Sequence, residues 1–170
     1  MTSAHGADRS LPSTAVANCI SAPAAFSPWI KESFAATLTT LEAVSGIRGF
    51  RLCRLAGIAE HCLFVSITVW DNIGHFERWR RSEAFTQAHP DRTRHQKQFE
   101  RMQTVRYDIE LDASVRPGDI DTEILHRLSA DCPELVPIGA VLMNEIAWTP
   151  SGSEPFHRSW ADTTEAEVRP

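Results

Sequence analysis

Residues 61–70 have the sequence HCLFVSITVW, and this stretch decides the fold class of the chain. It is rich in β-branched and aromatic residues, which favour a β-strand. Alternate residues of a strand face opposite sides of a sheet. Phe64 and Trp70 would then lie on one side, and Val65 and Val69 on the other. Both sides are apolar, so the sequence predicts a sheet whose two faces are both covered.

Three further segments favour strands. Residues 14–20 and 49–55 precede residues 61–70, and both contain β-prone residues, the second segment less regularly. Residues 103–111 follow, and their apolar residues alternate onto one face. The sequence therefore predicts four strands in this part of the chain.

Two segments between these strands favour helices. Ser27 is suited to the N-cap of a helix and Pro28 to its first turn. Apolar residues then recur every three or four positions through residues 26–44, which is the spacing of one buried helical face. Residues 72–89 form the second predicted helix, with a break near Ser82 and an end before the proline that follows.

The predicted order of elements is strand, helix, strand, strand, helix, strand. This βαββαβ order is the ferredoxin-like pattern of an α+β fold, in which two helices cover one face of a four-stranded antiparallel sheet. The second face is apolar as well and needs a cover. We expect a second copy of the chain to pack on it, sheet against sheet, as a homodimer with the form of a dimeric α+β barrel.

The predicted domain spans residues 14–111. Residues 1–13 are rich in Ser, Ala, Gly and Pro, and we expect them to be a disordered N-terminal extension. Residues 112–170 are a C-terminal extension of unknown role. Within it, residues 121–130 favour a helix and residues 138–148 favour a strand.

Composition and charge exclude several classes of partner. The 170 residues carry a formal net charge of −5, which argues against nucleic acid as the main partner. No apolar segment approaches the ~20 residues that span a bilayer, and the N-terminus lacks the apolar stretch of a signal peptide. The four cysteines form no CxxC pair and have no zinc-site spacing. We therefore expect a cytoplasmic protein with reduced thiols and no membrane partner.

The segment from Trp70 to His89 holds the residues best suited to chemistry. Phe76, Trp79 and Phe85 recur on one side of the predicted helix, and His89 lies one turn beyond Phe85. A Trp and a His would then border the space between helix and sheet. Taken singly, Trp79 is also suited to fill a core, and His89 to cap the helix end, where the helix dipole favours a positive charge.

Basic residues gather in this segment and after it. They fit a solvated helix face, which is the simpler interpretation. They also fit a surface that meets a small anionic ligand, such as one with carboxylates. The residues are Arg78, Arg80, Arg81, Arg92, Arg94, Lys97 and Arg101.

Between Trp70 and His89 the sequence has the pattern W-x(5)-F-x-x-W-x-x-S-x-x-F-x-x-A-H. This pattern resembles the antibiotic biosynthesis monooxygenase (ABM) superfamily and, within it, the IsdG-type heme-degrading monooxygenases. In that family a Trp and a His lie ten positions apart on this helical segment, and an Asn lies on the first strand some sixty positions earlier. Trp79 and His89 have that separation, and Asn18 lies 61 positions before Trp79. The resemblance covers about residues 14–111.

The resemblance implies a heme-degrading monooxygenase that binds heme as substrate and cofactor. His89 would be the axial ligand of the heme iron, Asn18 would donate a hydrogen bond toward the iron-bound ligand, and Trp79 would press the porphyrin out of planarity. Phe76 and Phe85 would line the ligand. With O₂ and an external reductant, the porphyrin would open and release iron and a linear tetrapyrrole. Cationic side chains would meet the heme propionates, and the candidates are Arg78, Arg92 and Arg94.

Two other functions fit the same residues. The first is a cofactor-free ABM oxygenase that acts on a quinol or a polyketide-like aromatic compound. There, Trp79, Asn18 and His89 would position the substrate, O₂ and a proton. The second is a non-enzymatic heme-binding protein, because a fold by itself does not choose between a catalyst and a carrier.

Overall fold

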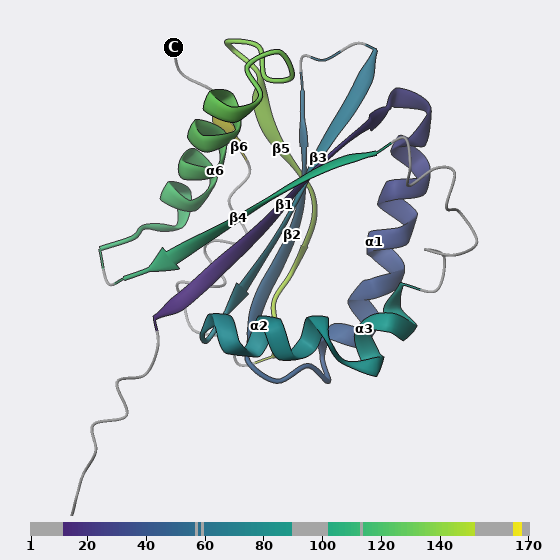
Figure 1. Cartoon of the computed structure of the whole chain (residues 1–170), viewed down its shortest axis with the longest axis vertical. Coiled ribbons are helices and arrows are strands. Elements are labelled where there is room, and N and C mark those ends of the chain that lie inside the picture. Colours follow the sequence, from purple (N-terminus) through teal and green to yellow (C-terminus); the bar gives the residue numbers. More distant parts are fainter. Residues whose placement is uncertain are drawn as a thin grey trace, which may run out of the picture.

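The fold is described from a computed structural model of the chain. The structure describes residues 12–56, 58, 60–89, 102–112, 114–151 and 165–167. The elements are β1 Ser13–Pro23, η1 Ala24–Phe26, α1 Ser27–Leu41, β2 Ile47–Leu55, β3 His61–Trp70, α2 Ile73–Arg80, α3 Glu83–Ala88, β4 Gln103–Leu111, α6 Pro117–Asp131, β5 Val141–Trp148 and β6 Glu165–Glu167 (Figure 1).

The strands form one sheet in the order β4-β1-β3-β2-β5-β6, and neighbouring strands are antiparallel. The first four of these strands, with α1, α2 and α3, confirm the predicted α+β ferredoxin-like pattern. The predicted break near Ser82 is confirmed too, since α2 ends at Arg80 and α3 begins at Glu83. In the C-terminal extension, α6 covers the predicted helix 121–130 and β5 lies within the predicted strand 138–148. The sequence did not predict that β5 would pair with β2 and β6 with β5.

Helices α1, α2 and α3 cover one face of the sheet, which we call the helix-side face. Its core is rich in aromatic residues, and Phe34 of α1 stacks on Phe50 of β2 with ring centroids 6.0 Å apart. The buried residues of the helix-side face are Val16, Ala22, Ile30, Leu41, Ile47, Phe50, Leu52, Cys62, Phe64, Trp70 and Phe76.

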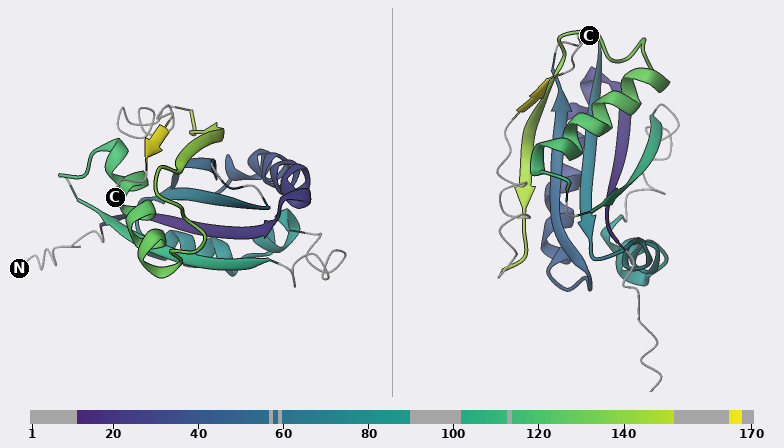
Figure 2. Two further views of the ribbon diagram at one scale, coloured as in Figure 1. Left: turned by 90° about the horizontal axis from the view of Figure 1, so that it is seen from above. Right: turned by 90° about the vertical axis from the view of Figure 1, so that its left-hand side faces the viewer.

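Helix α6 and the segment that follows it cover the opposite face, which we call the α6-side face. Figures 1 and 2 show α6 and α1 on opposite sides of the twisted sheet. The apolar side chains of α6 that pack on the sheet are Ile120, Ile124, Leu125 and Leu128. The sheet contributes Ala15, Ala17, Cys19, Cys53, Leu55, Leu63, Val65, Ile67, Val69, Tyr107, Ile109, Leu111 and Leu142.

A buried ion pair joins α6 to the sheet. Arg51 of β2 points to the α6-side face, and its Nη1 donates to Oδ2 of Asp121 at 2.6 Å. Both side chains are 0% exposed. Removing one partner from such a pair leaves a buried charge uncompensated, so this contact specifies how α6 docks.

The cover of the second face therefore differs from the predicted one. We expected a second subunit there, because residues 14–111 leave that face bare. Instead α6, which begins at Pro117, and residues 132–142 fill the position within the same chain. The second face is thus covered within the chain, while the sheet-to-sheet homodimer, the dimeric barrel and the domain boundaries stay predictions.

Some predictions fall partly outside the described residues. Of the N-terminal extension 1–13, only the last two residues are described, and Ser13 already belongs to β1. Arg92 and Arg94 lie outside the described residues as well. Within the described ranges, no helix combines the length and the apolar character that a membrane crossing needs.

Candidate functional site

Five aromatic rings from β3, α2 and α3 meet on the helix-side face, and we call them the aromatic cluster. Ring centroids of Trp70 and Trp79 lie 5.5 Å apart, those of Trp79 and Phe85 4.8 Å, and those of Phe85 and His89 4.1 Å. Phe76 packs edge-on against Trp70 at 5.7 Å. The structure thus brings together four predicted site residues, Phe76, Trp79, Phe85 and His89. Sequence reasoning placed Trp70 before the helix but gave it no part in the site.

Ser82 lies between α2, which carries Trp79, and α3, which carries Phe85, and its hydrogen bonds fix how these two helices meet. Its hydroxyl donates to the backbone oxygen of Trp79 at 2.6 Å and accepts from the backbone N–H of Phe85 at 3.2 Å. A serine hydroxyl can serve as acceptor for the start of a helix, which is why α3 begins here. The turn therefore fixes the ring of Trp79 against that of Phe85.

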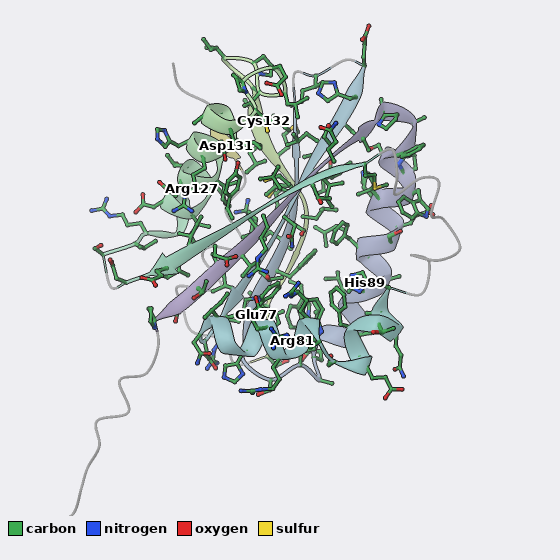
Figure 3. All side chains as sticks on the ribbon, viewed as in Figure 1. Glu77, Arg81, His89, Arg127, Asp131 and Cys132 are labelled. Carbon is green, nitrogen blue, oxygen red and sulfur yellow. The ribbon has the colours of Figure 1, made fainter. Side chains whose placement is uncertain are left out.

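His89 follows the last residue of α3 and is half-buried. Figure 3 labels its side chain at the end of this helix. Its ring Nδ1 lies 2.7 Å from the backbone oxygen of Phe85. A carbonyl oxygen only accepts, so Nδ1 carries the hydrogen. In the neutral ring the lone pair then belongs to Nε2. His89 is consequently oriented to accept a proton, or to bind a metal, through Nε2.

The indole N–H groups of the two tryptophans in the cluster differ. Nε1 of Trp70 donates to the hydroxyl of Thr68 at 2.7 Å. Nε1 of Trp79 is buried and has no hydrogen-bond partner among the described residues. A buried donor without an acceptor costs about 1–3 kcal/mol, so this N–H is suited to meet an acceptor atom of a ligand.

Asn18 faces the same side of the sheet but stands apart from the cluster. It pairs in register with Ser66 of β3 and Arg106 of β4, whereas Trp70 pairs with Thr14. Four residues of β1 separate the two rows, which is about 13 Å along the strand. The side chain of Asn18 is half-buried and makes no hydrogen bond within the described part of the chain, so its amide is available to a ligand.

Arg106 connects the row of Asn18 to α2, and sequence reasoning missed it. Its Nη2 donates to Glu77 at 3.0 Å and to Asp108 at 2.8 Å, and its guanidinium lies 4.5 Å from the centre of the Phe76 ring. The Arg106 hydrogen bond lowers the pKa of the Glu77 carboxyl. The alternation of apolar residues in β4 was a usable signal, because it puts Arg106 on the face opposite Tyr107.

The predicted basic group is a solvated face where the structure describes it. Arg78, Arg80 and Arg81 lie on the exposed side of α2 and the turn after it. Arg80 donates to Glu77 at 3.0 Å. The exposed positions of these three residues fit a solvated helix face, and contact with an anionic ligand stays an untested prediction.

The C-terminal extension contributes to the helix-side face. Ile146 and Trp148 of β5 pair in register with Leu52 and Phe50 of β2, and both pack against the buried residues of that face. Glu145, directly before Ile146, accepts a hydrogen bond from Arg54 at 2.8 Å and pairs with Lys31 of α1 at 3.0 Å. The predicted strand over residues 138–148 did not indicate which face of the sheet its side chains would join.

The cluster fits heme only in part. The orientation of His89 Nε2 is suited to an iron ligand. Trp79 and His89, however, are in direct ring contact with centroids 6.3 Å apart, so a porphyrin does not lie between them in this arrangement. Among the described residues, no group of three or more His, Cys, Asp or Glu side chains is placed to hold a metal ion.

Two solved structures and one family model are similar to parts of this chain. SnoaB from Streptomyces nogalater, a cofactor-independent oxygenase, is similar in structure at 17% identity and a TM-score of 0.44, over 61% of this chain and 97% of its own. PA3566 from Pseudomonas aeruginosa is similar at 21% identity and a TM-score of 0.43, with the same two shares. Among curated proteins, none matches. The family model of the antibiotic biosynthesis monooxygenases matches residues 15–91 of this chain.

Proposed function

We propose that this chain is an O₂-dependent monooxygenase that uses no resident cofactor and oxidises an electron-rich aromatic compound on the helix-side face. The family supports monooxygenase chemistry. The observation that carries the finer proposal is the buried indole N–H of Trp79, which lacks an acceptor and lies beside the ring of His89. A donor and a proton acceptor side by side suit a substrate that loses a proton and gains negative charge.

The chemistry balances without an external reductant for one class of substrate. In an anthrone, a CH₂ carbon lies between two aromatic rings opposite a carbonyl. O₂ converts this CH₂ to a second carbonyl, so one oxygen atom enters the product. The other oxygen atom leaves as water with the two hydrogens of the CH₂ group. The substrate supplies all four electrons that O₂ accepts.

Each residue has a role that follows from its position. Nε2 of His89 accepts the proton of the CH₂ group, because Nδ1 already holds a hydrogen against Phe85. The negative charge then moves to the carbonyl oxygen of the substrate, and Nε1 of Trp79 donates to that oxygen. The amide of Asn18 lies about 13 Å along β1 from the row of Trp70, so it suits a polar group at the end of the substrate that is farther from His89.

Heme is the second candidate, and one observation favours it. Histidines that bind metals donate their other ring N–H to a carboxylate, a backbone carbonyl or water, which is the arrangement of His89 and Phe85. Heme would here be substrate and cofactor, held by His89 and Asn18, and its iron would supply the activation of O₂. The ring contact between Trp79 and His89 favours the first candidate, because this arrangement leaves no space between them for a porphyrin.

Oxygen uptake by the purified protein with anthrone, corrected for spontaneous oxidation, tests the proposal. We expect uptake without added hemin and a loss of most of it in Trp79→Phe and His89→Gln. Tyr107→Phe is the matched control, because it removes one donor from an aromatic residue on the α6-side face.

A hemin titration separates the candidates. If uptake requires hemin, and a Soret band forms that His89→Ala abolishes, heme is the substrate and the proposal is wrong. If that band is stable to reductant and air, with no iron released, the protein is a heme carrier. Catalase is included so that free peroxide does not imitate turnover.

A further inference from the structure

We infer that α6 takes the place of a second subunit, so that one chain of this protein is a complete unit and exists as a monomer. An apolar second face is the feature that would drive two such sheets together. The structure shows that this face is already used. The inference does not depend on which substrate the protein oxidises.

The packing of α6 covers the centre of that face. Ile120 and Ile124 are 0% exposed, and so are Val65 and Ile67 of the central strand β3. The apolar residues of α6 recur at the spacing of one helical face, and that whole face lies on the sheet. A partner would have to displace the helix before it could touch these strands.

Polar contacts hold α6 at its beginning and at its end. Asp121 pairs with buried Arg51 in the first turns. Near the other end, the Tyr107 hydroxyl of β4 donates to Oδ2 of Asp131 at 2.7 Å, and Arg127 donates to the backbone oxygen of Asp108 at 3.2 Å. Figure 3 shows Arg127 and Asp131 on this helix.

Arg51 makes the face specific for α6 rather than for a second sheet. A guanidinium in the middle of an apolar face needs an anion, and Asp121 is that anion. In a two-fold dimer through this face, each chain would present an arginine to the apolar strands of the other. The sequence of the strand and that of the helix are therefore matched to each other.

Little apolar surface remains for another interface. Among the described residues, only Ile138 and Met143 are large hydrophobic side chains classed as exposed. A stable homodimer buries roughly 800 Å² on each partner, and the buried core of such interfaces is mainly apolar. Ile138 and Met143 by themselves do not form an interface of this size.

The mass of the full-length chain in solution tests the inference. Sedimentation equilibrium over a wide range of concentration should give the mass of one chain, 19.0 kDa, without a concentration-dependent increase. A stable dimer of the wild-type chain would overturn the inference. This result is independent of activity, so it stands or fails separately from the proposed function.

Two substitutions in the full chain show whether the packing of α6 on the sheet keeps the protein monomeric. Ile124→Asp places a charge between α6 and the sheet, and we expect the exposed face to drive self-association. His126→Asp adds the same charge on the exposed side of the same helix and should leave the mass unchanged. A folded and monomeric Ile124→Asp protein would contradict the role of α6. If Ile124→Asp does not fold, the milder Ile124→Ala is measured by sedimentation equilibrium instead. Self-association of Ile124→Ala would support the role of α6, and a monomer would contradict it.

Discussion

The two faces of the sheet differ in the side chains that fill them, although each has a buried polar atom without a partner among the described residues, Trp79 Nε1 on one and Asn144 Oδ1 on the other. The α6-side face is mostly aliphatic, and a buried ion pair between Arg51 and Asp121 crosses it. The helix-side face is aromatic, and the indole N–H of Trp79 and the amide of Asn18 have no partner there among the described residues. One sheet thus carries a face built for stability and a face with polar groups available to a ligand. Substitutions on the two faces should therefore affect different properties.

The largest expected difference lies in thiol reactivity. Burial raises the pKa of the Cys19 and Cys53 thiols, both on the α6-side face, from 9.0 to about 12. Three pKa units lower the reactive thiolate about a thousandfold, and burial adds a steric barrier. Titration with a disulfide reagent should modify half-buried Cys132 first, and Cys19 and Cys53 only after unfolding. Rapid modification of either buried thiol would show that α6 does not seal the face.

Asp121→Asn should cause the largest loss of stability among these variants. The substitution keeps the shape of the side chain but removes the carboxylate charge that is paired with the buried guanidinium of Arg51. We expect the free energy of unfolding in urea to fall by about 3–5 kcal/mol. Glu123→Gln breaks an exposed pair with Arg127 on the same helix and should cost no more than about 0.5 kcal/mol. Equal losses in the two variants would contradict the account of the α6-side face.

Trp79→Phe and Tyr107→Phe should show that the helix-side face affects activity and the α6-side face affects stability. Each removes one hydrogen-bond donor and keeps a ring. Trp79→Phe should lower kcat/KM for anthrone about tenfold or more, equivalent to about 1.4 kcal/mol, with little change in stability. Tyr107→Phe should lower the free energy of unfolding by about 1 kcal/mol and leave kcat/KM unchanged. The comparison fails if the two variants show the same profile in kinetics and urea unfolding.

The smallest expected effect is on acid stability near the site. Hydrogen bonds from Arg106 and Arg80 lower the pKa of Glu77 from 4.5. A carboxyl whose pKa is lowered by folding stabilises the protein above its unfolded pKa, and this contribution disappears as pH falls through the folded value. Glu77→Gln should therefore cost about 0.2–1 kcal/mol at neutral pH and nothing at a pH well below 4.5. If the difference in the free energy of unfolding between wild type and Glu77→Gln grew as the pH fell, it would contradict the lowered pKa of Glu77.

The sequence predicted the ferredoxin-like part because its signals are local. The alternation in residues 103–111 and the composition of residues 61–70 are properties of single strands. The break at Ser82 was also predictable, since a serine suited to cap a helix follows a complete helical segment. These features need no knowledge of the rest of the chain.

The sequence did not predict which surfaces meet, because periodicity identifies an apolar side without naming its partner. The spacing of Ile120, Ile124 and Leu128 shows that α6 is amphipathic, yet nothing in it selects a sheet face. Arg51 was the available signal, since a charged residue among apolar ones in a buried strand needs an anion. The separation of Asn18 from Trp79 is likewise a property of the register between strands, and sequence spacing does not give it.

Oxidation of anthrone under ¹⁸O₂ by protein free of heme tests the central claim most directly. Substrate oxidation on the helix-side face by the chain alone predicts one ¹⁸O atom in the quinone carbonyl and the other in water. It also predicts that Trp79→Phe lowers labelled product while Tyr107→Phe does not. A quinone without ¹⁸O, hydrogen peroxide as the reduced product, or labelled product only after hemin is added would contradict the account.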